Sequence, residues 1–313
     1  MNMWNKLFKK KIKLVTHDGT FHVDDLFSAA LLSMYMEHMD ENFKIIRSRN
    51  QKVIDNADYV FDVGGVYNPD INRFDHHQLN GAGNRENGIA YSSFGLVWKH
   101  FGLILCGGDK DAWEHVDNKI VAPIDASDNG IDIVESKIKN ITPYTAGQVF
   151  KIFTPTWRER NLSGDEVFQN EVKNIIRVLK REIKVALDES LARKLILTDY
   201  NNSKNKKIVE MTGVGYSRGL YQDTLSRLPE PIYVVFKSEH HDVWKIEAIK
   251  KSPETFDSRQ PFPENWRGSM GDDSKLSKIS GVADATFCHR NGFLATAKTR
   301  EGAIKLAQIA LES

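Results

Sequence analysis

The sequence is poor in cysteine, in charge of one sign and in long apolar runs. Its two cysteines, Cys106 and Cys288, are too few for a disulfide framework or a four-thiolate zinc site, which fits a reducing compartment. The 43 basic and 42 acidic residues nearly cancel, so no bulk field argues for or against a nucleic-acid partner. No apolar stretch reaches the roughly 18 residues of a membrane helix, and the basic start as far as Lys11 lacks the apolar core of a signal peptide. We therefore expect a cytoplasmic protein without membrane contact.

Two motif classes are also missing. The sequence has no Gly-x-Ser-x-Gly and no phosphate-binding loop that ends in Gly-Lys-Ser/Thr, so serine hydrolases and nucleoside triphosphatases lose support. What is present is the composition of an ordinary globular protein, with 41% hydrophobic and 27% charged residues. A length of 313 residues favours two domains over one.

Apolar periodicity predicts an α/β first domain over residues 1–160. A helix that begins at Asp24 or Asp25, after a strand and a polar loop, would open a βαβ unit. The expected strands cover residues 12–16, 43–47 and 57–63. Later helices are expected at 92–101 and 112–121, and Pro123 would end the second of them, so that Asp125 follows it.

A long helical stripe over residues 164–195 predicts a connecting helix, to which we assign residues 161–198. Beyond it, strand-like runs are followed by one last helix at 301–311. That pattern predicts a smaller α+β domain over residues 199–313. Its strand-like runs cover residues 207–211, 232–236 and 243–249.

Histidine and aspartate residues gather in four short clusters, each at the end of an apolar run. The clusters are His17 to Asp25, Asp62, Asp75-His76-His77, and Asp125 to Asp128. A lone Asp-His-His sequence would be read as a surface turn with a capping aspartate. Because an open α/β sheet places its binding residues at the ends of its strands, the three further clusters favour one shared site.

The donors in these clusters suit two divalent metal ions. His17 and His22 can approach one ion across a glycine turn, and Asp62, alone at a strand end, can bridge both ions. The second ion would be completed by Asp24, His76 and Asp125. Oxygen-rich donors with a few imidazoles suit Mn²⁺ as first choice, then Mg²⁺ or Fe²⁺, with Zn²⁺ as a further alternative. Two such ions lower the pKa of a bridging water and hold attacking and leaving oxygens, so the reaction implied is hydrolysis of a phosphate ester.

Two assignments remain open between neighbours. Adjacent side chains on an extended segment point to opposite sides, so His77 would face away from the metal of His76 and touch a phosphate oxygen, or else be merely solvated. In the fourth cluster we prefer Asp125 as the ligand. Asp128 is either the alternative ligand or a cap of the Asp-Asn-Gly turn.

The predicted second domain holds two cationic groups. Arg267 follows Trp266, and His289-Arg290 precedes an Asn-Gly turn. Arginine suits bidentate phosphate contact, and an aromatic ring can stack on a base. A packed tryptophan beside an exposed arginine is the structural alternative. We predict a substrate-binding role for Arg267, His289 and Arg290, because phosphate chemistry needs cations opposite its metals.

Together these residues resemble the DHH phosphoesterase superfamily, which includes RecJ-type exonucleases and family II pyrophosphatases. The sequence is most similar to the Myg-type branch, the melanocyte-proliferating-gene protein family. The matching motifs are His17…His22-Val23-Asp24, Asp62-Val63-Gly64-Gly65, Asp75-His76-His77-Gln78 and Asp125…Asp128-Asn129-Gly130. The similarity continues through Pro263 to Gly268 and Phe287 to Phe293, so it covers nearly the whole chain.

The resemblance implies a DHH-like parallel-sheet lobe with a dinuclear metal site, joined to a second lobe that contacts substrate. It assigns one ion to His17, His22 and Asp62, and the other to Asp24, Asp62, His76 and Asp125. It also implies nuclease activity, because eukaryotic Myg-type proteins are regarded as 3′ to 5′ RNA exonucleases. Leu79 stands where a basic residue often occurs in the family, which weakens the expected grip on nucleic acid.

The leading hypothesis is a metal-dependent phosphodiesterase that trims single-stranded RNA or short oligonucleotides from the 3′ end. One alternative keeps the metals but hydrolyses a small phosphoester, such as a dinucleotide or pyrophosphate. Another is a structural or regulatory metal-binding protein without turnover. The sequence leaves open the native metal, the choice between RNA and DNA, and the formation of a homo-oligomer.

Overall fold

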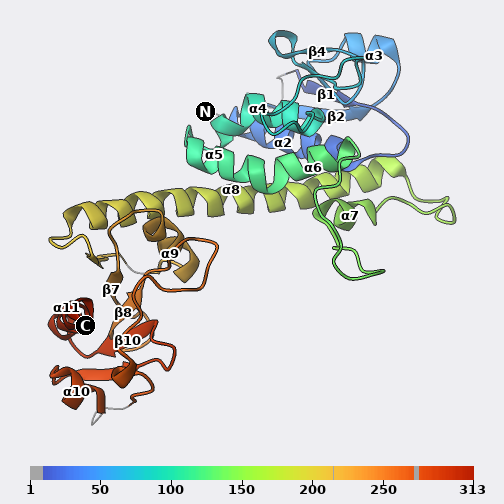
Figure 1. Ribbon diagram of the computed structural model, residues 1–313. Helices are drawn as coiled ribbons and strands as arrows, with labels where there is room; N and C mark the ends of the chain where they lie inside the picture. Colours follow the sequence, from blue (N-terminus) through green and yellow to red (C-terminus); the bar gives the residue numbers. More distant parts are fainter. Residues whose placement is uncertain (1–9, 214, 271–274) are drawn as a thin grey trace. The chain divides into compact units, whose positions relative to one another are not determined.

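The chain forms two compact units, Met1–Asp188 and Glu189–Ser313. The computed structural model (Figure 1) describes residues 10–213, 215–270 and 275–313, so most of the basic start lies outside the described residues. Each unit combines helices with one mixed sheet, and the protein is of the mixed α/β class. The division between the units falls within the long helix that the sequence predicts.

The first sheet confirms the strands expected near the start of the chain. Its strands are β1 (Ile12–Thr16), β2 (Phe43–Arg47), β3 (Tyr59–Phe61), β4 (Tyr67–Asn68) and β5 (Arg73–Phe74). They lie in the order β2-β1-β3-β5-β4, and all neighbours are parallel except β4 and β5. The interior strand β1 is buried towards its carboxyl end, as expected of a parallel strand covered on both faces.

Helices cover this sheet and build the larger core. They are α2 (Val23–His38), α3 (Gln51–Asp55), α4 (Ser93–Leu105), α5 (Lys110–Val116), α6 (Ala122–Asp128), α7 (Ala146–Lys151) and the first part of α8 (Gly164–Asn202). Helix α2 is apolar around most of its circumference and is therefore buried. Its Phe27 packs against Phe94 of α4, with ring centroids 5.1 Å apart, and against Phe150 of α7 at 5.3 Å.

The expected end of the helix at Pro123 is wrong. The chain passes from α5 through a π-helical turn, Asp117–Val121, directly into α6, which carries Pro123 in its first turn. Proline is tolerated there because the first N–H groups of a helix have no partner within the helix. Asp125 and Asp128 consequently lie on α6 instead of following a finished helix.

Helix α8 extends farther than the predicted 164–195 and has 39 residues. Its buried stripe in the first unit includes Phe168, Val172, Ile175 and Leu179, at the 3- and 4-residue spacing of an amphipathic helix. Charged residues fill the other face. Among the residues described, no helix is both long and apolar enough to cross a membrane.

The second unit combines a mixed sheet with the helices that follow α8. Its strands are β6 (Ile208–Glu210), β7 (Tyr233–Lys237), β8 (Trp244–Ala248), β9 (Ala285–Cys288) and β10 (Leu294–Ala297). Only β6 and β7 are parallel in the order β6-β7-β8-β10-β9. Its helices are α9 (Arg218–Ser226), α10 (Lys275–Ser280) and α11 (Arg300–Glu312). The sequence analysis missed β9, β10, α9 and α10, because short apolar runs do not distinguish helix from strand.

Two glycine substitutions test the packing of the second unit. A Cβ at Gly302 of α11 would overlap the Asp284 carboxylate, which accepts a 2.8 Å hydrogen bond from the Thr299 N–H at the start of that helix. A Cβ at Gly219 of α9 would meet nothing within 4 Å. We expect Gly302→Ala to lower the free energy of unfolding by about 1–3 kcal/mol. Gly219→Ala should leave it unchanged or raise it by up to about 1 kcal/mol. Urea denaturation measures both, and equal stabilities would contradict the described packing.

Candidate metal centre

Three of the four predicted clusters come together at one edge of the first sheet. His17 directly follows β1, Asp62 follows β3, and Asp75-His76-His77 follows β5. From β1 the chain passes through α2 to β2 on one side, then through α3 to β3 on the other side. The gap between the carboxyl ends of β1 and β3 is therefore the topological switch point, where open α/β sheets bind their ligands.

His17 lies at the bottom of this gap. Its Nε2 is 3.0 Å from Asp25 Oδ2 and 3.1 Å from Asp62 Oδ2, and its side chain is 2% exposed. Burial alone would lower the pKa of His17, but the two carboxylates outweigh burial and raise the pKa to about 10. His22 lies beside it, with ring centroids 5.5 Å apart.

Asp62 is the central residue of the cluster. Its Oδ1 lies 3.2 Å from His76 Nε2 and its Oδ2 faces His17. Burial opposes its ionisation, but hydrogen bonding to the two imidazoles lowers its pKa to about 2. The backbone of Asp62 has a φ of 53°, a left-handed conformation that costs free energy in a residue other than glycine. This turn directs the carboxylate into the gap.

His76 links Asp62 to two further acids. Its Nε2 lies 3.7 Å from Asp24 Oδ2 and 3.4 Å from Asp128 Oδ2. Asp24 is 1% exposed, and neither of its carboxylate oxygens has a hydrogen-bond partner among the described residues. Burial and the nearby Asp62 and Asp128 raise the pKa of Asp24 well above its usual value. An ionised Asp24 therefore requires a cation nearby.

The two adjacent histidines do not point to opposite sides as expected. Their ring centroids lie 4.3 Å apart, because the segment after β5 is a turn rather than a strand. Asp75 Oδ1 accepts hydrogen bonds from the backbone N–H groups of His76 (2.8 Å) and His77 (3.2 Å) and holds that turn. It also lies 2.7 Å from Nδ1 of His77, whose side chain is 59% exposed. Asp75 thus orients His77 at the open side of the cluster.

Asp125 and Asp128 contact different residues. Asp128 approaches His76 and Asp24, whereas Asp125 is buried against the start of α4. The Asp125 carboxylate accepts from the Ser92 hydroxyl (2.6 Å) and the Gly95 N–H (3.0 Å), and it also pairs with Arg85. Burial raises the pKa of Asp125 to about 6 despite these partners. The geometry therefore favours Asp128 over the preferred Asp125 as a ligand.

Arg85 is an anchoring residue beside the cluster that the sequence analysis did not single out. Its side chain is 7% exposed and pairs with Asp117 at 2.8 Å as well as with Asp125. Its guanidinium lies 4.4 Å from the centre of the Tyr91 ring. These contacts fasten the glycine-rich segment after the Asp-His-His motif to α6. An arginine inside a Gly- and Asn-rich segment is a weak signal, because such segments are usually solvated.

The donor atoms fit divalent metal ions. Three groups each offer ligand atoms within 4.8 Å of one another: His17, His22 and Asp62; Asp62, His76 and His77; and Asp24, His76 and Asp128. The buried oxygens of Asp24 have no hydrogen-bond partner in the described part of the chain, and those of Asp62 face only imidazoles of the same cluster. Buried carboxylate oxygens without partners are costly, and carboxylates and imidazoles from several elements converge here, so the cluster suits a bound cation.

The three residues of the second unit that the sequence predicts to bind substrate make only local contacts or lie exposed. Arg267 donates through Nε to the Phe262 carbonyl (2.9 Å), beside the buried Trp266, and Gly292 leaves room for that contact. His289 Nδ1 accepts from the Asn291 N–H at 3.1 Å, and Arg290 is exposed. Their predicted role in substrate binding stays a prediction.

Comparisons with known proteins agree on one family. The family model MYG1_exonuc, described as "Uncharacterised protein family (UPF0160)", matches residues 13–311. The chain is 28% identical to the MYG1 exonuclease of Mus musculus, covering 96% of this chain and 84% of that protein. It is 30% identical to a MYG1 protein of Schizosaccharomyces pombe, with 96% and 98% covered, and 29% identical to one of Chlamydia pneumoniae, with 95% and 96% covered.

Metal binding should displace protons from the cluster. His17, with a pKa of about 10, is protonated at neutral pH and must lose that proton before Nε2 can bind a metal ion. We expect Mn²⁺ affinity to rise between pH 6 and pH 8 by about tenfold per pH unit for each displaced proton. Calorimetric titrations in buffers of different ionisation enthalpy count the protons. His17→Gln should reduce that count, and an affinity independent of pH would contradict the prediction.

Two substitutions distinguish a metal-binding role of Asp128 from a structural role of Asp125: Asp128→Asn and Asp125→Asn. Asp128→Asn should lower Mn²⁺ affinity by at least about tenfold and leave the metal-free fold intact, because it removes repulsion with Asp24. Asp125→Asn deprives the buried Arg85 of a partner and should lower the free energy of unfolding by roughly 3 kcal/mol. Mn²⁺ titration and urea denaturation in chelator measure the two effects. The assignment would be reversed if Asp125→Asn lost metal without losing stability.

Proposed function

The chain belongs to the MYG1_exonuc family, and we propose that it is a metal-dependent phosphodiesterase that removes nucleotides from the 3′ end of RNA or short oligonucleotides. The observation that carries this proposal is the convergence of buried carboxylates and imidazoles at the switch point of a largely parallel sheet, where both oxygens of Asp24 lack a hydrogen-bond partner among the described residues. The name of the mouse relative, an exonuclease, supports hydrolysis of phosphodiester bonds.

In this proposal the residues of the DHH-like lobe divide into two ligand sets that share Asp62. His17, His22 and Asp62 would hold one divalent ion, with Mn²⁺ as the first choice. The other ion would be held by Asp24, Asp62, His76 and Asp128. When bound, such ions lower the pKa of a water and neutralise the charge of a phosphate group.

The protein's own contribution is orientation. Asp75 fixes the His77 ring through Nδ1, so that Nε2 is left for a non-bridging phosphate oxygen at the exposed side of the cluster. The buried positions of Asp24 and Asp62 exclude bulk water from the base of the site. Because positioning and charge stabilisation supply most of the catalysis in phosphoryl transfer, no covalent nucleophile is needed.

Substrate contacts from the second unit are part of the same proposal. Arg290 is exposed, and the terminal nitrogens of Arg267 extend beyond its Nε contact with Phe262. Guanidinium groups suit bidentate contact with phosphates along a single strand. We therefore keep Arg267, His289 and Arg290 as candidate substrate contacts.

Hydrolysis of a small phosphoester, such as a dinucleotide or pyrophosphate, is the second candidate. It is favoured by the formal net charge of +1, because proteins that bind long nucleic acids usually carry a basic field. Leu79, which is fully exposed beside the Asp-His-His motif, offers no cation where a strand could pass. The two candidates differ in how turnover depends on substrate length.

Single-stranded RNA labelled at its 5′ end tests the proposal. With Mn²⁺ we expect a ladder that shortens from the 3′ end. His76→Ala and Asp62→Asn should each reduce the rate by more than about a hundredfold, since each removes interactions worth several kcal/mol in the transition state. His38→Ala is the matched control, because His38 is exposed at the end of α2 and lies outside the metal-binding groups.

The outcomes separate the candidates. Loss of the ladder in both site variants, with the control unchanged, supports an exonuclease that uses this site. Cleavage of dinucleotides or pyrophosphate but not of longer RNA would replace the first candidate with the second. A metal-loaded wild type that releases nothing from any of these substrates would refute both.

A further inference from the structure

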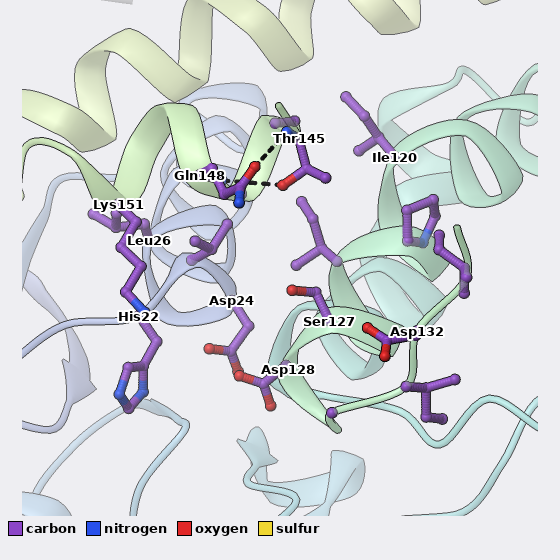
Figure 2. A pocket seen from close by; sticks show the side chains of 18 of the residues that line it. His22, Asp24, Leu26, Ile120, Ser127, Asp128, Asp132, Thr145, Gln148 and Lys151 are labelled. Atoms are coloured by element: carbon purple, nitrogen blue, oxygen red, sulfur yellow. Dashed lines mark hydrogen bonds between the residues drawn. The ribbon is translucent and has the colours of Figure 1, made fainter. Parts of the chain in front are cut away.

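The metal centre opens into a cleft of about 960 Å³ within the first unit. Figure 2 shows His22, Asp24 and Asp128 at one end of this cleft, and Ile120 with Thr145 and Gln148 at the other. Ligand pockets for small molecules typically enclose roughly 300–1,000 Å³. The cleft is therefore large enough for more than the phosphate group at the metal centre.

One wall of the cleft is apolar. Ile131, Ile133 and Val134 line it, yet their side chains remain 38%, 53% and 54% exposed. They belong to residues 129–145, a segment without helix or strand that begins immediately after Asp128. The Ile131 N–H donates to the Ala126 carbonyl (2.8 Å) and holds the segment against α6. Clustered exposed apolar side chains beside a polar centre are typical of a ligand-binding groove.

A fixed amide lies in the same cleft. The Thr145 N–H donates to Gln148 Oε1 at 2.8 Å, and the Gln148 N–H donates to Thr145 Oγ1 at 3.3 Å, the two bonds drawn in Figure 2. This capping box orients the Gln148 side chain. Its Nε2 has no hydrogen-bond partner within the described part of the chain and can donate to a ligand. Lys151, in the following turn, adds a positive charge to the same cleft.

We propose that this cleft is a nucleoside pocket for the 3′-terminal nucleotide, an inference that rests on the proposed phosphodiesterase function. The phosphate of that nucleotide lies at the metal centre, and its base packs on the apolar wall of Ile131, Ile133 and Val134. Gln148 Nε2 donates to an acceptor on the base edge. Every base offers an apolar face and edge acceptors, so the pocket favours nucleotides without selecting among bases.

Such a pocket would allow a protein with a net charge of only +1 to select nucleotides. A pocket for the terminal nucleoside distinguishes a nucleotide ester from a bare phosphoester by apolar contact, which needs no basic surface. The apolar side chains that would give this selectivity for nucleotides belong to residues 129–145, a segment that supplies no metal ligand in our assignment. Substitutions of the side chains of this segment that line the cleft should therefore change substrate preference without changing metal binding.

Two phosphodiester substrates distinguish the contribution of the pocket from that of the cleavage step. Uridine 5′-(p-nitrophenyl phosphate) and methyl p-nitrophenyl phosphate release the same leaving group when water adds its oxygen to phosphorus and the P–O bond to p-nitrophenol breaks. Only the first carries a nucleoside. The ratio of their kcat/KM values measures the contribution of the pocket.

The variants form a matched pair within one segment. Ile133→Asn with Val134→Asn alters the wall, whereas Ile138→Asn with Ile141→Asn alters two apolar side chains that do not line the cleft. All four side chains are at least half exposed, so none of the changes should unfold the protein. We expect the wall variant to lower kcat/KM for the uridine ester by about tenfold or more and to leave the methyl ester unchanged. The control should leave both unchanged.

A binding measurement without metal or turnover tests the nucleoside pocket separately from the proposed phosphodiesterase function. The fluorescence of 2-aminopurine riboside, an uncharged nucleoside, should change when it binds to the wild type and to the control. The nucleoside should bind more weakly to the wall variant. Equal binding by all three proteins, or equal kcat/KM of the wild type for both esters, would overturn the pocket and leave the phosphodiesterase standing. Selective nucleoside binding without cleavage of either ester would support the pocket and overturn the proposed function.

Discussion

The first unit depends on holding several carboxylates close together in a buried gap. The acids are Asp24, Asp25, Asp62 and Asp128. Like charges repel strongly where water is scarce, so this arrangement persists only with positive charge among them. His17 and His76 lie between the acids, and both have raised pKa values. The opposite pKa shifts of Asp24 and Asp62 follow, because only Asp62 faces both imidazoles closely.

Contacts outside the cluster keep its ligands in place. Asp75 holds the turn of the two histidines, and Asp125 ties α6 to the start of α4. Arg47, at the end of β2, does the same for the loop between β1 and α2: it donates to the Gly19 carbonyl at 2.6 Å and pairs with Asp165 of α8 at 2.8 Å. Its guanidinium lies 4.8 Å from the centre of the Phe168 ring. Three separate anchors thus fix the backbone around ligands that repel one another.

Much of this arrangement could be predicted from the sequence. The bounds of β1 and β2 and the existence of α2 and α8 followed from apolar periodicity, which is strong in buried strands and long amphipathic helices. The convergence of three clusters followed from their positions at strand ends. The errors have local causes: Pro123 was read as a stop although it stands in a first turn, and the turn after β5 brings the His76 and His77 rings together. Arg85 left no pattern, because its partners Asp117 and Asp125 are distant in sequence.

The neutral charge balance is compatible with a phosphate substrate, because the relevant charge is local. Without metal, the carboxylates around Asp62 would repel a phosphate group, and Lys119 and Arg85 are already paired, Lys119 with Glu182 and Arg85 with Asp117. In the proposed function, two divalent ions would carry as much positive charge as the carboxylates of Asp24, Asp25, Asp62 and Asp128 carry negative charge, so their binding would remove the repulsion without any change on the surface. Selectivity must then come from short-range contacts. An apolar wall next to the metal centre supplies such contacts, and a basic surface would not, because it binds every polyanion.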